Sequence, residues 1–366
     1  MDICDLAPSY IRAIAPYQPG KPIPELAREM GLDESGIIKL ASNENPLGAS
    51  PLAQRAVREA LDGISRYPDG NGFELKRALG ARFGVEHQNI VLGNGSNDVL
   101  ELAARAFLTP EHSAVYSQHA FAVYPLAVQA IGAAAIEVPA RAFAHDLDAM
   151  RRAVRSDTRV LFIANPNNPT GTYAPPAAVE AFLAALPGHV AVVLDEAYHE
   201  YLPLELRGDS IGWLQRFPNL IVTRTFSKVY GLAGLRVGYA LASAGIADLM
   251  NRVRQPFNVN SLSLAAAAAA LEDLEFVRRS FEVNQAGLKT VTRGLSELGL
   301  QYIVPFGNFV TFKVPDASGV FQRLLKLGVI VRLVASYGMP DHLRVTIGTA
   351  SENARFLDSL ARALAA

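Results

Sequence analysis

Short apolar runs that alternate with helical patterns are the feature that most restricts the fold of this chain. Runs such as VAVVL contain only aliphatic residues, with no polar residue at alternate positions. A strand of this composition is buried on both faces, as in a parallel sheet that helices cover. We therefore predict an α/β fold with a mostly parallel sheet, whose strands include Ala114 to Tyr116, Ala133 to Val138, Val160 to Ala164, Val190 to Leu194 and Leu220 to Val222.

The chain has 366 residues, of which 50% are hydrophobic, and this is enough for two domains. Residues 1–35 read as a proline-rich arm with one short helix and too few apolar residues for a core of their own. We predict a large domain over residues 36–278. Residues 279–366 combine helical and strand patterns, so we predict a smaller α+β domain there, which the arm joins.

Composition excludes several classes of function. The formal net charge is −1 and the pI is near 6.7, so the chain lacks the basic surplus that nucleic-acid binding requires. Cys4 is the single cysteine, and no histidine or cysteine spacing indicates a metal site. The segment Ala120 to Ile136 is interrupted by Pro125 and Gly132, which predicts a helix and a buried strand instead of a membrane span. Without a signal-peptide pattern, we expect a cytoplasmic protein.

A lysine and an arginine lie in a glycine-rich segment, Thr223 to Gly238, directly after the last apolar run. Open α/β sheets bind ligands at the carboxyl ends of their strands, where Thr225, Ser227 and Lys228 follow here. Arg236 offers a planar set of donors that suits a phosphate, and the amine of Lys228 can form a Schiff base. A single lysine is more often a solvated surface charge. An amine beside a phosphate clamp, however, indicates pyridoxal phosphate.

A second glycine-rich segment, Gly93 to Asp98, joins the short strand Ile90 to Leu92 to a helical pattern that starts at Val99. The free N–H groups at the start of such a helix bind anions, and the helix dipole assists them. An ordinary helix with Ser96 or Asn97 as its N-cap is the alternative interpretation. Valine stands where the third glycine of a dinucleotide-binding fingerprint would be, so the segment does not match that fingerprint.

Two further polar motifs follow apolar runs. In NPNNPTG, Asn165 to Gly171, two prolines stiffen the turn that carries Asn168, whose amide can donate to a phenolate oxygen; an ordinary Asn-Pro turn is the alternative. Asp195 ends VAVVL, where a buried carboxylate is costly unless a cation accompanies it. A protonated pyridine nitrogen would be that cation, and the pair would serve as an electron sink. Tyr198 is within reach of the same phenolate oxygen, which would be that of pyridoxal phosphate.

The motifs GNGSND, NPNNPTG, DEAY, TFSK and GLAGLRVG, in this order, resemble those of the fold-type I aminotransferases that use pyridoxal phosphate. The segments PYQPGKP, KLASNENPLG and RYPDG resemble the histidinol-phosphate aminotransferase family within that group. The C-terminal segment VRLVASYGMPDHLRVTIGT is similar as well. The resemblance covers nearly the whole chain, and the combination of motifs is highly specific.

The resemblance implies how the cofactor is bound. Lys228 would be the Schiff-base lysine, and Asp195 would contact the pyridine nitrogen. Asn168 and Tyr198 would contact the phenolate oxygen, with Tyr198 assisting catalysis, and Phe121 would stack on the face of the ring. The residues implied for the cofactor phosphate are Ser96, Asn97, Thr225, Ser227 and Arg236.

The resemblance also implies substrate groups and a partner. Arg344 would receive a substrate carboxylate, and Arg332 and Tyr17 would help to bind a substrate phosphate. Tyr67 would reach the cofactor phosphate of a neighbouring subunit. A homodimer with shared active sites is therefore implied, with the arm of residues 1–35 at its interface.

We expect transfer of an amino group between histidinol phosphate and imidazole acetol phosphate on one side and glutamate and 2-oxoglutarate on the other, in histidine biosynthesis. The first alternative is an aromatic amino acid aminotransferase acting on phenylalanine or tyrosine. A threonine-phosphate decarboxylase is a second alternative, because its fold and phosphate handling are similar. A transcription regulator with an aminotransferase-like domain is disfavoured, because only about 35 residues precede the fold, fewer than a DNA-binding module needs.

Overall fold

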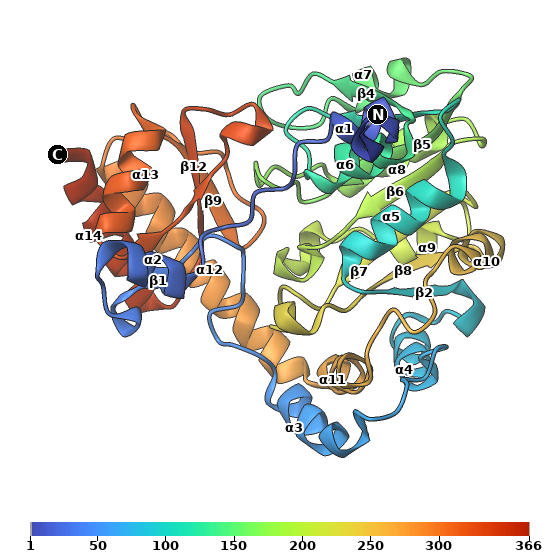
Figure 1. Ribbon diagram of the computed structural model, residues 1–366, viewed down its shortest axis with the longest axis horizontal. Helices are drawn as coiled ribbons and strands as arrows, with labels where there is room; N and C mark the ends of the chain where they lie inside the picture. The colour runs from blue at the N-terminus through green and yellow to red at the C-terminus, as the bar shows by residue number, and fades with distance from the viewer. Residues whose placement is uncertain (1, 366) are drawn as a thin grey trace.

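A seven-stranded sheet forms the centre of the molecule in the computed structural model, which describes residues 2–365 (Figure 1). The strand order is β2-β8-β7-β6-β5-β3-β4. Only β8 runs antiparallel to its neighbours, so the prediction of an α/β fold with a mostly parallel sheet is confirmed. The strands are β2 (Ile90–Gly93), β3 (Ser113–Ser117), β4 (Ala134–Val138), β5 (Thr158–Ala164), β6 (Ala191–Asp195), β7 (Leu220–Thr225) and β8 (Gly238–Ala242).

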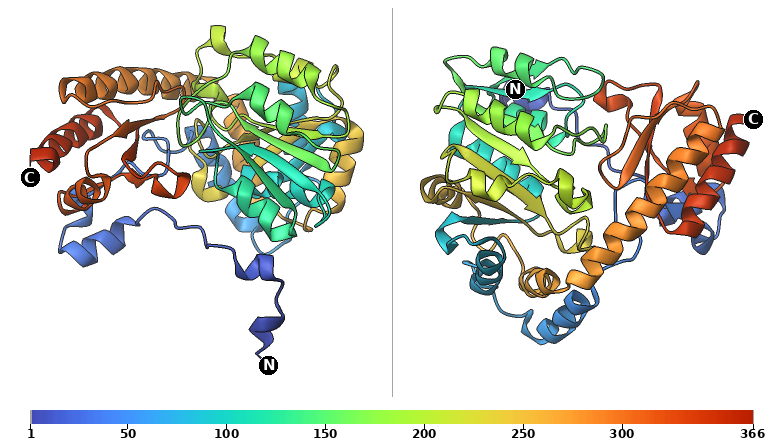
Figure 2. Two further views of the ribbon diagram at one scale, coloured as in Figure 1. Left: turned by 90° about the horizontal axis from the view of Figure 1, so that it is seen from above. Right: turned by 180° about the vertical axis from the view of Figure 1, so that it is seen from behind.

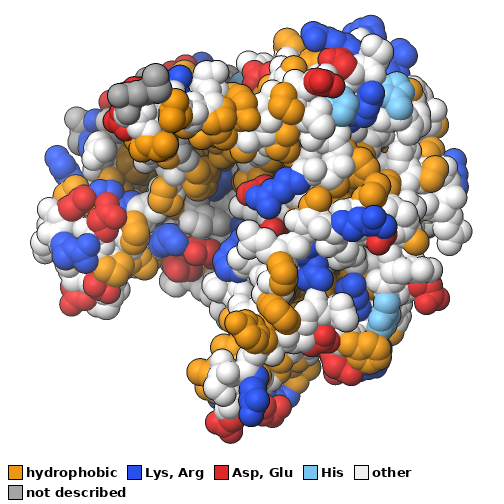
Figure 3. Space-filling model, turned by 45° about the vertical axis from the view of Figure 1, so that its right-hand side comes forward, with side chains coloured by type: hydrophobic (Ala, Val, Ile, Leu, Met, Phe, Trp, Pro, Cys, Tyr) orange, Lys and Arg blue, Asp and Glu red, His pale blue; other side chains and the backbone are white. Residues whose placement is uncertain are grey.

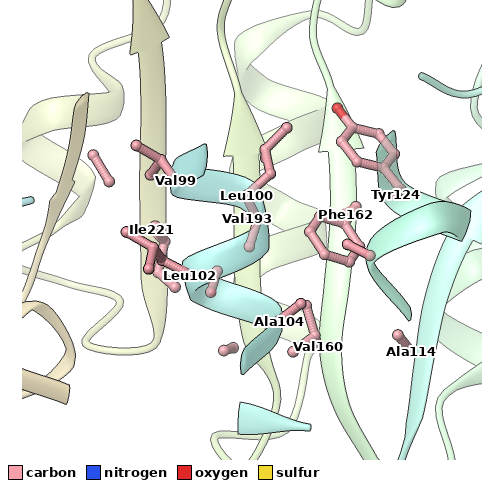
Figure 4. Close-up of a cluster of buried hydrophobic side chains, with 14 of the residues drawn as sticks. Val99, Leu100, Leu102, Ala104, Ala114, Tyr124, Val160, Phe162, Val193 and Ile221 are labelled. Carbon is pink, nitrogen blue, oxygen red and sulfur yellow. The ribbon is translucent and has the colours of Figure 1, made fainter. Parts of the chain in front are cut away.

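Helices cover both faces of this sheet because successive residues of a strand point to opposite sides. Val160 and Phe162 of β5 pack against α5 (Ser96–Phe107) and α6 (Val123–Ile131), in the cluster of buried side chains drawn in Figure 4. Leu161 lies in the cluster on the opposite face. The helices of that face are α7 (Leu147–Ala153), α8 (Pro176–Ala185) and α9 (Ser210–Trp213). Helix α10 (Ala244–Arg252) packs in the same cluster as α5 and α6.

Three helices pack beside the β2 edge of the sheet. They are α3 (Pro51–Ala60), α4 (Phe73–Phe83) and α11 (Ser261–Glu272), and their apolar side chains form a core with those of β2 and β8. Helix α11 ends at Glu272, directly before Asp273. Asp273 breaks the helical path, because its carboxylate accepts from Ser50 Oγ and from the backbone N–H of Phe276, where it caps the next helix.

One predicted strand is placed differently in the structure, and one strand was not predicted. The strand over 133–138 was predicted to be buried, but β4 is the edge of the sheet and only Val138 is buried in it. In the C-terminal part, Tyr302 forms an isolated bridge with Phe312 and belongs to no strand. The sequence analysis did not identify β8, because the strand begins at Gly238, the last residue of the glycine-rich segment, and only the short 3₁₀ helix Ala233–Leu235 separates it from β7. β8 closes the gap between β2 and β7.

A second, antiparallel sheet lies in the C-terminal part, with strand order β11-β12-β9. Its strands are β9 (Phe309–Lys313), β11 (Arg332–Leu333) and β12 (His342–Thr346), and the helices α12 (Leu274–Glu297), α13 (Ala317–Lys326) and α14 (Ala350–Ala365) share its core. Helix α12 is continuous between two cores (Figure 2). Val277 packs against the core of α3, α4 and α11, and Leu288 is buried in the core of the small sheet. The predicted boundary at 278/279 falls within this helix, and the domain division stays a prediction.

The N-terminal segment extends along both parts of the molecule (Figure 2). Helix α2 (Ile23–Met30) packs against Leu325 of α13 and Ile330 of β10 (Val329–Ile330). Strand β10 pairs in parallel with β1 (Ile38–Lys39), and the two form a separate two-stranded sheet. The short helix α1 (Ser9–Arg12) instead lies against α6 of the large sheet. Within residues 2–365, none of the helices combines the length and apolar character that crossing a membrane requires.

Candidate active site

A cavity of about 240 Å³ lies at the carboxyl ends of β5, β6 and β7, between the large sheet and the small one. The space-filling view shows the surface hollowed between the two parts of the molecule, with basic side chains beside the hollow (Figure 3). Strand ends of an open α/β sheet are the usual place for a ligand. The predicted residues that line this cavity are Tyr17, Ser96, Asn97, Phe121, Asn168, Asp195, Tyr198, Thr225, Ser227, Lys228, Arg236, Arg332 and Arg344.

Lys228 follows β7 and reaches into the cavity. Its Nζ donates to the backbone carbonyl of Ser42 at 3.1 Å and lies 5.8 Å from the centre of the Tyr198 ring. Removal from water lowers the pKa of Lys228 to about 7, and the positive charge of Arg344 acts in the same direction. A large fraction of this amine is therefore neutral near pH 7, and a neutral amine can act as a nucleophile and a base.

The start of α5 provides free backbone donors. Gly95 occupies the N-cap position and no side chain caps the helix, so the alternative of Ser96 or Asn97 as an N-cap is wrong. Arg236 lies against Gly95, where an added Cβ would be 2.3 Å from its Nη2 atom. The same guanidinium donates to Ser227 Oγ at 3.2 Å. Hydroxyls, free N–H groups and an arginine together form a site for a phosphate dianion.

Asp195 ends β6 and is only 5% exposed. Its Oδ2 accepts from the hydroxyl of Tyr124 at 2.8 Å, and its Oδ1 accepts from Thr223 Oγ1 at 3.2 Å. Burial raises the pKa of Asp195 to about 6, against the opposing effect of these hydrogen bonds. No lysine or arginine among residues 2–365 forms a salt bridge with it. A protonated pyridine nitrogen would supply the cation that this buried carboxylate lacks.

Arg344 connects β12 of the small sheet to the loop after β5. Its Nη1 donates to Asn168 Oδ1 and its Nη2 donates to the carbonyl of Ala41 at 2.7 Å, whereas its buried Nε has no partner among the described residues. Because Asn168 accepts through its oxygen, its NH₂ group is left to donate elsewhere. The hydroxyl of Tyr198 accepts from Asn43 Nδ2 at 2.8 Å. An anionic ligand would satisfy the remaining donor of Arg344.

Arg332 and Tyr17 form the outer end of the cavity. The guanidinium carbon of Arg332 lies 5.5 Å from the centre of the Tyr17 ring, and its Nη2 donates to the carbonyl of Gln18. Arg332 also pairs in register with Arg344 across β11 and β12. Tyr17 is 51% exposed, so this end of the cavity is open to solvent. Two guanidinium groups of neighbouring strands therefore face the same cavity.

Tyr67 is the one predicted site residue that does not line the cavity. It is 84% exposed and stacks on Phe257 with ring centres 4.9 Å apart. A role at the cofactor site of its own subunit is therefore excluded by position. The predicted role at a neighbouring subunit's site stays a prediction, because only one chain is described.

The cavity contains residues to which the sequence analysis gave no role. Ser42 and Asn43 lie in the segment KLASNENPLG, which entered the sequence analysis only as part of the resemblance, and Tyr337 lies in VRLVASYG. The polar residues that recur within these two segments were the only signal in the sequence that could have indicated a role for them. Tyr124, behind Asp195, carried no signal, because its neighbours in sequence are apolar.

The model of the family "Aminotransferase class I and II" matches residues 35–360, and the chain belongs to this family. The sequence-based prediction of a pyridoxal-phosphate-dependent aminotransferase is thereby confirmed at the level of the family. The cavity fits this cofactor, because three features face the cavity: a buried acid without a cationic partner, a cluster of hydrogen-bond donors suited to a phosphate, and a lysine with a lowered pKa.

Several relatives indicate a narrower class. The chain is 64% identical over 365 residues to histidinol-phosphate aminotransferase 2 of Nitrosospira multiformis, covering 100% of this chain and 93% of the relative. It is 63% identical to histidinol-phosphate aminotransferase of Methylobacillus flagellatus, covering 98% of each. The solved structure of histidinol-phosphate aminotransferase from Sinorhizobium meliloti in complex with pyridoxal-5'-phosphate matches with a TM-score of 0.89 and 28% identity, covering 98% of this chain and 97% of the other.

Proposed function

We propose that this aminotransferase exchanges an amino group between histidinol phosphate and imidazole acetol phosphate and between glutamate and 2-oxoglutarate, as a step of histidine biosynthesis. The observation that carries the proposal is the pair Arg332 and Arg344 in one cavity. A phosphate-bearing amine and a dicarboxylic amino acid both need a cation beyond the reacting carbon, and guanidinium suits phosphate and carboxylate alike. The names of the relatives at 64% and 63% identity support the same substrate.

Each side chain of the inner cavity has a proposed role toward pyridoxal phosphate. Lys228 would attach the cofactor covalently, Asp195 would keep the pyridine nitrogen protonated, and Asn168 and Tyr198 would bind the phenolate oxygen. Phe121 stacks on the ring. The phosphate is bound by Ser96, Asn97, Thr225, Ser227 and Arg236, which line the inner end of the cavity. When bound, this cofactor withdraws electrons from the α-carbon of the substrate.

Lys228 moves the proton in the proposed mechanism. Once the substrate amine had displaced it, the free amine of Lys228 would accept the proton of the substrate α-carbon and hold it for delivery, so that Nζ would act first as a base and then as an acid. A pKa near 7 leaves the amine neutral in a large fraction of the protein molecules at physiological pH, because burial disfavours the charged form. Tyr198 keeps its own proton, because burial raises its pKa to about 12, and it therefore acts as a hydrogen-bond donor.

The outer end of the cavity selects the substrate. Arg344 is held by Asn168 and Ala41 and retains a free Nε, so it is proposed to bind the carboxylate of glutamate. Arg332, with Tyr17, is proposed to bind the phosphate of histidinol phosphate. Phenylalanine has a carboxylate but no phosphate, so a contact between Arg332 and a phosphate would favour histidinol phosphate over phenylalanine.

We further propose a homodimer in which Tyr67 contacts the cofactor phosphate of the partner subunit. The stacked and largely exposed pair of Tyr67 and Phe257 supports this, because exposed aromatic pairs are common in interfaces. The arm of residues 1–35 would contribute to the same interface, and residues 36–278 and 279–366 would be the two domains. We place the enzyme in the cytoplasm, where the free thiol of Cys4 stays reduced.

The decisive experiment compares three phosphate-bearing or aromatic amines. Single-turnover changes in cofactor absorbance and steady-state kcat/KM are measured with histidinol phosphate, phenylalanine and threonine phosphate. We expect the highest kcat/KM with histidinol phosphate. A preference for phenylalanine would overturn the proposal in favour of an aromatic aminotransferase, and release of carbon dioxide from threonine phosphate would indicate the decarboxylase.

A further inference from the structure

A buried tyrosine contacts the acid of the cofactor site from behind. Tyr124 lies in the first turn of α6, is 0% exposed, and donates its hydroxyl hydrogen to Asp195 Oδ2 at 2.8 Å. Figure 4 shows its hydroxyl pointing away from the apolar cluster in which the ring is packed. The other oxygen of Asp195 accepts from Thr223 Oγ1 at 3.2 Å. Each carboxylate oxygen of Asp195 therefore has one neutral donor.

The ring of Tyr124 is held in place by two aromatic neighbours. It stacks on Phe162 with ring centres 4.8 Å apart and planes inclined by 9°. Its edge contact with Phe121, at 5.9 Å and 85°, reaches the residue proposed to lie on the face of the cofactor ring. Such packing leaves the hydroxyl little freedom, so the position of the hydrogen bond is defined by the core.

We propose that Tyr124 is a positioning residue for the cofactor, which orients the carboxylate of Asp195 toward the pyridine nitrogen and supports Phe121 beneath the ring. The inference rests on the roles proposed above for Asp195 and Phe121. A neutral donor suits this task better than a lysine or arginine, because a cation would neutralise the carboxylate that the pyridine nitrogen needs.

Electrostatics support the geometry. Burial raises the pKa of Tyr124 well above its usual value, so the hydroxyl keeps its proton and donates it. Burial also raises the pKa of Asp195, and Glu196 adds to this, whereas the hydrogen bond from Tyr124 lowers it. Lys228 and Tyr198 face Asp195 from the cavity. Loss of the Tyr124 hydroxyl would therefore raise the pKa of Asp195 further and favour its neutral form near pH 7.

The test is the substitution Tyr124→Phe, which keeps the ring contacts and removes only the hydroxyl. The dissociation constant of pyridoxal phosphate is measured on the apoprotein, together with the pH dependence of the bound cofactor's absorbance. We expect about tenfold weaker binding, because a hydrogen bond to a charged group is lost. The kcat with glutamate is expected to fall with little change in KM. Wild-type affinity and an unchanged absorbance profile would overturn the inference.

Tyr239→Phe is the matched control. Tyr239 is 1% exposed, and its buried hydroxyl has no hydrogen-bond partner among residues 2–365, so its removal tests the loss of a core hydroxyl alone. This variant should bind the cofactor like the wild type. If Asp195→Asn also binds and turns over normally, the proposed role of Asp195 fails; if only Tyr124→Phe is normal, this inference alone fails.

A second pair of variants avoids the aromatic core. Thr223→Val removes the other hydroxyl, and Thr223→Ser keeps it. We expect Thr223→Val to bind the cofactor more weakly by a smaller factor than Tyr124→Phe, since its bond is longer, and Thr223→Ser to restore binding. Equal affinity of Thr223→Val and wild type would mean that Asp195 needs no orienting hydroxyl, and would count against the inference even if Tyr124→Phe did not fold.

Discussion

The inner and outer ends of the cavity differ in how their charged groups are held. At the inner end, Asp195 accepts hydrogen bonds from Tyr124 of α6 and Thr223 of β7, and Arg236 donates to Ser227 in the loop after β7. At the outer end, Arg332 is held by the exposed arm, through the ring of Tyr17 and the carbonyl of Gln18. The difference shows that the groups proposed for the chemistry are held within the core, whereas Arg332, proposed for substrate choice, is held by a solvent-exposed segment.

The largest expected effect concerns the inner end. Lys228→Ala removes both the covalent attachment and the base, so turnover should fall on the order of a thousandfold or more. Borohydride reduction followed by peptide mass spectrometry should place the cofactor on Lys228 in the wild type. Lys39→Ala is the control, because Lys39 pairs with Glu44 at 3.0 Å and has no proposed role. Attachment to another lysine would contradict the assignment.

Asp195→Asn should have the next largest effect. An amide cannot favour a protonated pyridine nitrogen, and about 3 kcal/mol of barrier, or roughly a hundredfold in kcat, should be lost. The variant should still fold, because removal of a buried charge relieves desolvation. Circular dichroism and steady-state kinetics check both points. Near-normal kcat would show that the inner end does not act through this carboxylate.

Arg344→Ala should damage both half-reactions, because Arg344 joins the two ends through Asn168 and Ala41. The lost charge-assisted hydrogen bonds correspond to about 1.5 to 3 kcal/mol each, or roughly tenfold to a hundredfold in kcat/KM. Kinetics with glutamate and with histidinol phosphate as separate donors measure the effect. Damage confined to one donor would mean that Arg344 belongs to the outer end alone.

Arg332→Ala should affect only the outer end. The KM of histidinol phosphate should rise by roughly tenfold, because a charge-assisted contact is lost, while the KM of glutamate should change less. Tyr17→Phe is a companion variant that keeps the ring beside Arg332. If phenylalanine were the natural donor, Arg332→Ala would leave the kcat/KM for phenylalanine almost unchanged, and the wild type would prefer phenylalanine to histidinol phosphate.

The smallest effect is a pH dependence of cofactor capture by the apoprotein. The pKa of Lys228 is lowered to about 7, so the amine is protonated below that pH and neutral above it. Only the neutral amine is a nucleophile, and the capture rate should rise with pH, level off above pH 7, and fall about tenfold per unit below it. Stopped-flow absorbance measures this rate. A rise that continued to pH 10 would indicate an ordinary, solvated lysine.

The local patterns of the sequence determined most of the large sheet and the inner end of the cavity. Apolar runs of VAVVL type predict buried strands, and the polar residues after them, such as Asp195 and Lys228, must meet where parallel strands end together. This part was predictable because strand direction alone brings these residues to one edge. The start of helix α5 beside Gly95 was predictable in the same way, because a glycine-rich segment joins the strand Ile90 to Leu92 to a helical pattern.

Only the tertiary structure decided which distant segments meet. Asn168 and Arg344 are separated by 176 positions, and Tyr124 and Asp195 by 71, and no local pattern encodes either contact. The antiparallel β8 and the edge position of β4 also depend on strand order, which propensity does not specify. Local composition decides whether a segment is buried and which secondary structure it adopts. Packing of the whole chain decides which neighbour that segment contacts, because many neighbours satisfy the same apolar pattern.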